Sequence, residues 1–159
     1  VAKREVNLYS PSGTMVYDGT PVTTSEVEIN PLPGFGDEFL DGEKPVFTYT
    51  SNQINVGSSL NTFTYEFPAG VNADNYNLNI NYGTLTVTKR PVTVQSADAE
   101  RQYKLQPLTA HEAKVTSELG FVEGDVIGYD FTGYQDVPGS SANKFEVQFK
   151  DLKTIANND

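Results

Sequence analysis

The chain has 159 residues, of which 37% are hydrophobic and 11% aromatic, with no cysteine and no tryptophan, which predicts a folded protein whose core needs no disulfide. Its formal net charge of −10 excludes the basic surface that binders of nucleic acid or anionic membranes need. We therefore expect no nucleic-acid partner and no membrane insertion, and no stretch reads as a signal peptide.

The first part of the chain alternates short apolar runs with turn sequences. Strands are predicted at Glu5–Tyr9, Glu26–Ile29 and Val46–Thr50, separated by clusters such as SPSG and NPLPGFGDE. Between them lies a Tyr-Asp-Gly sequence in which Asp18-Gly19 predicts a turn, because aspartate caps such loops and glycine tolerates a positive φ.

A second group of strands shows clearer alternation. Phe63, Tyr65 and Phe67 interleave with polar residues, which predicts a half-buried strand with these aromatic side chains on the core face. Tyr76, also on an apolar phase, is expected in the core as well. The run that begins there leads through Gly83 into Thr84–Thr88, and we predict a hairpin whose loop uses a positive φ at the glycine.

Sliding the sequence against itself by 86 positions reveals two copies of one unit. VNLYS then meets VTVQS, YDGTPVT meets YKLQPLT, and two Gly-Phe pairs coincide. Further on, NVGSSLNTFTYEF matches DVPGSSANKFEVQF with one inserted residue, Pro138. We predict two modules, residues 1–89 and 90–159.

The junction between the modules is marked by a change of phase. Leu85 and Val87 are the apolar positions before Arg90-Pro91, and Val92 and Val94 are those after it. Because side chains alternate faces in a strand, this shift moves the buried side across the chain. The last strand of one core is expected to give way to the first strand of the next.

The second module is predicted to lack its last hairpin, because the chain has no second counterpart of YNLNINYGTLTVTK. Unpaired strand edges predict fraying or strand-mediated self-association of this module. We predict an all-β fold of two small immunoglobulin-like sandwiches. The alternative is a β-grasp-like α+β fold, which a helix at Leu108–Gly120, repeated at Val22–Gly34, would indicate; we interpret Leu108–Gly120 as a strand.

An acidic stretch, GDEFLDGEK, provides the candidate metal ligands Asp37, Glu38, Asp41 and Glu43. Carboxylate oxygens are the ligands that calcium prefers. Their spacing does not follow the known calcium-loop pattern, however, so a solvated loop is favoured. We predict no cofactor, with calcium as the alternative.

The sequence does not favour catalysis. His111 is the one histidine, there is no cysteine, and no nucleophile elbow is present. Two small cores leave little room for the cleft that a pair of catalytic carboxylates needs. We predict no catalytic residues and no enzyme. An internal Lys-Asn crosslink is an alternative that remains open, with Lys44, Lys89 or Lys144 beside strands, although it requires a buried lysine.

Two tyrosines are candidates for ligand binding. Tyr82 lies at the predicted turn and Tyr134 precedes the QDVPGSS loop, so both are expected to be exposed. Tyrosine offers a flat apolar face and a polar tip, which suits contact with a glycan or a protein.

Three motifs in order, VYDGTPVT, NVGSS and DNYNLNINYGTLTVTK, resemble the MBG and YDG repeats of bacterial surface adhesins, often described as mucin-binding-type modules. The resemblance covers the first module. The second has Tyr103-Lys104-Leu105 in place of Tyr-Asp-Gly, which weakens the inference that its turn is alike.

This resemblance implies repeats at the cell surface or in the cell wall of a bacterium, next to further repeats of the same chain. They would act as a stalk or spacer with weak adhesion. The alternative is direct binding of a host mucin glycan or protein ligand through Tyr82 and Tyr134. The shared motifs look like turn and core positions, so the resemblance assigns no binding residue.

Overall fold

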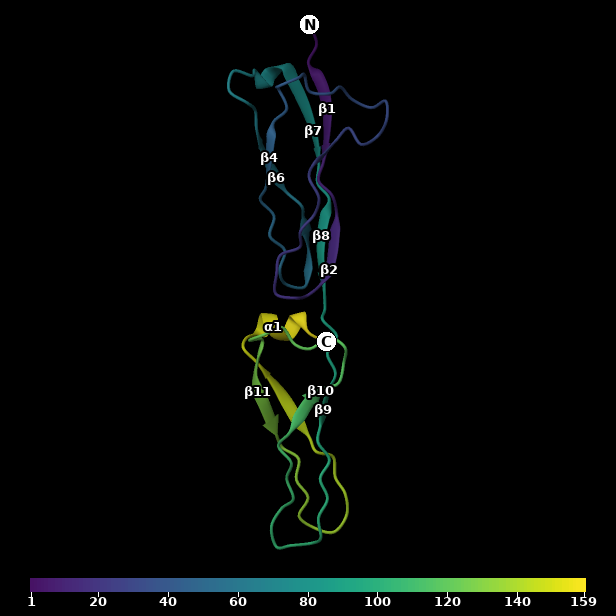
Figure 1. The fold of residues 1–159 in the computed structure, drawn as a ribbon, viewed down its shortest axis with the longest axis vertical. Coiled ribbons are helices and arrows are strands. Elements are labelled where there is room, and N and C mark those ends of the chain that lie inside the picture. Colours follow the sequence, from purple (N-terminus) through teal and green to yellow (C-terminus); the bar gives the residue numbers. More distant parts are fainter. The chain divides into compact units, whose positions relative to one another are not determined.

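The computed structural model describes residues 1–159 and is almost entirely β, with 35% strand and 6% helix. It has several small sheets and no closed barrel, which is an all-β fold of sandwich type, as predicted. The chain divides into a first unit, Val1–Val16 with Thr20–Thr88, and a second unit, Tyr17–Gly19 with Lys89–Asp159 (Figure 1).

The first unit contains three small sheets with the strand orders β3-β1-β7, β2-β8-β5 and β4-β6. Its elements are β1 (Arg4–Tyr9), β2 (Gly13–Val16), β3 (Glu28–Ile29), β4 (Val46–Tyr49), β5 (Gly57–Leu60), β6 (Phe63–Glu66), the 3-10 helix η1 (Ala73–Asn75), β7 (Tyr76–Asn81) and β8 (Thr84–Thr88).

The first two strands of this unit pair in parallel with its last two. β1 pairs with β7 from Arg4–Tyr76 to Tyr9–Asn81. Further along, β2 pairs with β8 in the same direction, and β5 pairs with the other edge of β8. The strands β1 and β2 therefore lie side by side with β7 and β8 (Figure 1).

The predicted hairpin between Tyr76 and Thr88 is wrong, because β7 and β8 do not pair and belong to different sheets. Gly83, between them, does not have a positive φ. A Cβ at this glycine would lie 2.5 Å from the Pro11 carbonyl and 2.5 Å from the Ser10 oxygen. Glycine is required here because two backbone segments approach closely as the chain passes from one sheet to the next.

The core of the first unit is apolar and aromatic. Val6 and Leu8 on β1 are fully buried and pack with Phe63 and Tyr76, as expected for Tyr76. Tyr65 is 42% exposed, so its predicted place in the core is wrong. It belongs to the two-stranded sheet β4-β6, and its ring meets Phe67 edge-on with ring centres 6.0 Å apart.

The second unit contains two two-stranded sheets, β10-β9 and β11-β12. Its elements are β9 (Val94–Ser96), β10 (Ala113–Val115), β11 (Val126–Phe131), β12 (Phe145–Phe149) and α1 (Leu152–Asn157). The strand predicted within Leu108–Gly120 is confirmed by β10. Neither this segment nor Val22–Gly34 contains a helix, so the β-grasp-like alternative has no support. The short helix α1 was not predicted.

Hydrogen bonds recur at matching positions in the two units. The Thr50 amide donates to the Thr62 carbonyl at 2.9 Å, and the Thr132 amide donates to the Lys144 carbonyl at 2.9 Å. Likewise, the Val22 amide donates to Gln53 O at 3.0 Å and the Leu108 amide to Gln135 O at 2.7 Å. The matching positions lie 86 residues apart at Val22 and 82 residues apart from Thr50 onward.

Contacts of two glutamine side chains correct the predicted alignment of the two modules in one detail. The Gln53 side chain donates to Asn55 O at 2.6 Å, and the Gln135 side chain donates to Val137 O at 2.8 Å. Two glycines that follow, Gly57 and Gly139, adopt nearly the same φ, 138° and 141°. Val137 therefore corresponds to Asn55, and no inserted residue is needed at Pro138.

Candidate functional site

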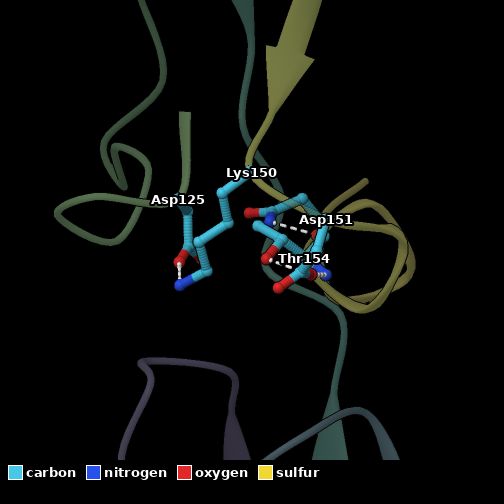
Figure 2. A network of polar contacts seen from close by, with 5 residues as sticks. Asp125, Lys150, Asp151 and Thr154 are labelled. Carbon is cyan, nitrogen blue, oxygen red and sulfur yellow. Dashed lines mark hydrogen bonds and ion pairs between the residues drawn. The ribbon is translucent and has the colours of Figure 1, made fainter. Parts of the chain in front are cut away.

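A group of interacting polar side chains lies in the second unit, at one end of β11 and β12 (Figure 2). We call Asp125, Lys150, Asp151 and Thr154 the Asp125 cluster. Asp125 closes a tight turn, since its amide donates to Val122 O at 3.1 Å. The other members follow β12 or belong to α1.

Asp125 and Lys150 form the ion pair at the centre of this cluster. The carboxylate of Asp125 is 1% exposed, and its Oδ1 lies 2.7 Å from Lys150 Nζ. The Lys150 backbone amide also donates to Asp125 O at 3.0 Å. The hydrogen bond to Asp125 raises the pKa of Lys150. Lys150 therefore stays a protonated ammonium and cannot act as a nucleophile at neutral pH.

Asp151 begins the helix α1 as its N-cap. Its Oδ1 accepts hydrogen bonds from the Thr154 amide and the Thr154 hydroxyl, both at 2.8 Å. These bonds to the ionised carboxylate lower the pKa of Asp151. At the other end, the Asn158 side chain donates to Thr154 O at 2.8 Å. The short helix is thus held by side chains at both ends.

Tyr17 adds a buried hydroxyl to the second unit. Its side chain is 4% exposed, and burial, followed by interaction with Asp125, raises its pKa. The Arg90 guanidinium donates to the Tyr17 carbonyl at 3.2 Å. Gly19, two residues on, has φ 83°, which confirms the predicted turn.

The chemistry available to this cluster is structural. Its ammonium is paired with a carboxylate, and its one hydroxyl, that of Thr154, donates to Asp151. No three histidine, cysteine, aspartate or glutamate side chains of the chain come together as a metal-binding group. The arrangement can fix a turn and a helix in place, and it lacks a general base beside a free nucleophile.

The four acidic candidates of the first unit are not brought together. Asp37 Oδ2 accepts from the Glu5 amide at 3.0 Å, and Glu43 accepts from the Tyr76 hydroxyl. Glu38 uses its backbone carbonyl to accept from Arg4, and Asp41 is exposed. Asp37 and Glu43 thus connect a long loop to strands, and calcium binding stays the alternative to the predicted solvated loop.

The other sequence candidates are at the surface. Lys44, Lys89 and Lys144 are exposed, which does not fit the burial that an internal crosslink requires. His111 is exposed and stacks on Phe131 with ring centres 5.5 Å apart.

The two candidate ligand-binding tyrosines lie in different units. Tyr82 is 39% exposed, and its ring meets Phe63 edge-on at 5.4 Å. Tyr134 is 60% exposed and lines an open groove of about 660 Å³ in the second unit. We call this the second-unit groove; its walls include Ser96–Glu100, Leu108–Ala110, Gly133–Gln135 and Gly139–Asn143.

Sequence patterns did not indicate the Asp125 cluster, because its members are brought together only by folding. The one local signal was Asp151 three residues before Thr154, which is an N-cap pattern. No protein-family model, curated protein or solved structure matches the chain. Among its helices, none has the length and apolar character needed to cross a membrane.

Proposed function

We propose that the chain consists of two tandem modules of the MBG and YDG type from a bacterial surface adhesin, and that they act as a load-bearing extracellular spacer. The recurrence of hydrogen bonds at matching positions in the two units supports the repeat. The sequence motifs carry the family resemblance. The net charge of −10 keeps such a segment soluble.

The parallel pairing of the first two strands with the last two is the observation that carries the spacer role. β1 begins the first unit and β8 ends it, and the paired strands run in one direction throughout. A force that pulls the ends of this unit apart slides β1 and β2 along β7 and β8, and loads their hydrogen bonds together. Resistance to such a force depends on the barrier to unfolding.

The second unit has much less of this pairing. Its parallel contact is the bridge between Arg90 and Asn158, supported by hydrogen bonds from the Arg90 amide to Asn157 O and from the Val92 amide to Asp159 O, each at 2.9 Å. We therefore expect the two units to yield at different forces, the second one first.

Single-molecule force spectroscopy on the full chain, held at its two ends, tests the spacer role. We expect two separate unfolding events, with the lower force assigned to the second unit by the contour length released. Replacing Val87, which is buried on β8, by alanine should lower only the higher force. Two weak events of equal force would contradict the proposal.

Direct adhesion is the second candidate, favoured by the exposure of Tyr82 and Tyr134. Binding of the full chain to mucin and to a glycan array, with and without calcium, tests it. Tyr82→Ala and Tyr134→Ala should each abolish saturable binding if these residues act as contacts. Tyr65→Ala is the matched control, because Tyr65 is as exposed as Tyr82. Absence of binding by the folded protein would leave the spacer role alone.

A further inference from the structure

In the first unit, β8 is the central strand of its sheet. It lies between β2 and β5, and neither of these strands pairs with any other. On β8, Leu85 and Val87 are 1% and 2% exposed, whereas Thr84 and Thr88, which flank them in the sequence, are exposed. The strand therefore supplies both hydrogen bonds and apolar side chains to the core.

The second unit has the two flanking segments without a strand between them. By the correspondences described above, β2 matches residues 99–102 and β5 matches residues 139–142. Neither segment forms a strand, and both are drawn as plain coil in Figure 1. Ala99 and Glu100 from one, and all of the other, line the second-unit groove. The groove thus takes the place that β8 occupies in the first unit.

The neighbouring strand β9 also has an open edge. It pairs with β10 through Val94 and Val115, as β1 pairs with β3 through the corresponding Leu8 and Ile29. The other edge, where β1 has β7, carries no strand. Val94 is accordingly half-buried, whereas Leu8 is fully buried.

Residues 158 and 159 already make the contacts with which a strand beside β9 would begin. Arg90 bridges Asn158 in parallel, as the corresponding Arg4 pairs with Tyr76. The Asp159 amide then donates to Arg90 O at 3.0 Å. A strand that continued in this direction would run along β9 and enter the second-unit groove.

We propose that the second unit binds an extended polypeptide segment as an added β-strand, parallel to β9 and to residues 99–102 and antiparallel to residues 139–142. Main-chain hydrogen bonds to unpaired strand edges are a known mode of peptide recognition. This inference rests on the correspondence of contacts between the units and does not need the proposed function.

The groove also indicates which segment it accepts. The sequence of β7 and β8 has aliphatic side chains at alternate positions, and Leu85 and Val87 are the pair that points inward in the first unit. Asp98 and Glu100 line the groove, so an acidic segment would be repelled. The expected partner is an uncharged or basic segment that alternates aliphatic with threonine or asparagine residues.

A synthetic peptide with the sequence of Tyr76–Thr88, added to the full 159-residue protein, tests the proposal by amide hydrogen exchange. We expect exchange in residues 139–142 and at Val94 to slow by at least about tenfold at saturation, as for amides that enter a stable ladder. A peptide with Leu85→Asn and Val87→Asn should give no protection. The matched peptide, with Thr84→Asn and Thr88→Asn on the outward positions, should still protect.

A second experiment places the segment in the same chain, where its effective concentration is high. The sequence of Leu78–Thr88 is appended directly after Asp159, since Asp159 corresponds to Asn77. Unchanged exchange in residues 139–142 with this extension would overturn the proposal. Equal protection by the peptide with Leu85→Asn and Val87→Asn and the peptide with Thr84→Asn and Thr88→Asn would also overturn it. Protection that grows with protein concentration in the absence of peptide would overturn it as well, because a second copy of the chain would then occupy the groove.

Discussion

Asn61 and Asn143 make the same contact in the two units: each donates a side-chain hydrogen bond to a backbone carbonyl near the start of its unit. The acceptor is Pro11 O at 2.8 Å for Asn61 and Ala97 O at 3.0 Å for Asn143. The two acceptors lie 86 positions apart. One asparagine thus connects the segments that flank β8 in the first unit, and the same connection exists where no such strand is present.

Replacing Asn61 by alanine should destabilise the first unit by about 2 to 4 kcal/mol, because buried partners lose their hydrogen bonds. Asn61 is 2% exposed, donates to Thr24 Oγ1 at 2.9 Å and accepts from the Ser51 hydroxyl at 2.7 Å. Asn143→Ala should cost the second unit less, about 1 to 2 kcal/mol, since its Oδ1 has no partner. Urea unfolding that resolves the two units measures both; equal losses would contradict this difference.

Replacing Gly83 by alanine should destabilise the first unit by about 2 to 3 kcal/mol, as an overpacked contact does. The added Cβ would collide with backbone atoms of Ser10 and Pro11, which cannot rotate away. Gly120→Ala is the control, because a Cβ there meets nothing within 4 Å and the glycine does not have a positive φ. If Gly83→Ala unfolds in urea like the unchanged protein, Gly83 does not lie this close to the backbone of Ser10 and Pro11.

Alkaline pH should weaken the second unit through Tyr17 and Lys150. Both pKa values are raised in the folded chain, from 10.0 and 10.5 respectively. A raised folded pKa gives stability that is complete below the unfolded pKa and is lost as the pH rises through the folded one. The urea midpoint of the second unit should therefore fall above about pH 10.

The variant Tyr17→Phe isolates the contribution of the tyrosine. It should make the alkaline decline of the second unit shallower, whereas Tyr134→Phe, which lies outside the Asp125 cluster, should leave it unchanged. Tyr76, whose pKa is raised by burial and by Glu43, gives the first unit a decline of the same sign. A second unit whose stability is flat to pH 12 would show that Tyr17 is not buried as described.

Acid should release the helix α1. The pKa of Asp151 is lowered from 3.8 by its bonds to Thr154, so its stabilising effect is present above about pH 4 and is lost as the pH falls through the folded value. Asp151→Asn keeps an N-cap acceptor but cannot titrate. We expect it to retain α1 at pH 7 and to remove this acid dependence, as followed by the exchange rate of the Thr154 amide. The Asp151→Ala variant should lose the helix at pH 7 as well as in acid.

Alternation in the sequence predicted which side chains are buried better than it predicted which strands pair. Leu85 and Val87 are buried on β8, as their phase indicated. The same pattern led to a hairpin that does not form, because periodicity defines the face of a strand and not its neighbour. The glycine between the two strands is typical of a turn in sequence, although it serves a close backbone approach that only the folded chain creates.

The polar cluster was beyond prediction for a related reason. The whole of β11 and β12 lies between Asp125 and Lys150 in the sequence, and nothing in their local sequence pairs them. The pairing follows from the antiparallel register, which brings the residues that precede β11 next to those that follow β12. Tyr17 is more distant still in sequence, and its burial could not be inferred from the turn of which it is part.

The contents of the two interiors affect how each unit responds to temperature. The fully buried side chains of the first unit are mainly apolar, including Val6, Leu8, Leu85 and Val87. Those of the second unit are polar: Asp125, Thr154 and Asn157. Exposure of apolar surface raises the heat capacity and exposure of polar surface lowers it. We therefore expect the second unit to unfold with a smaller heat-capacity increment than the first, so that its enthalpy of unfolding changes less between cold and warm conditions.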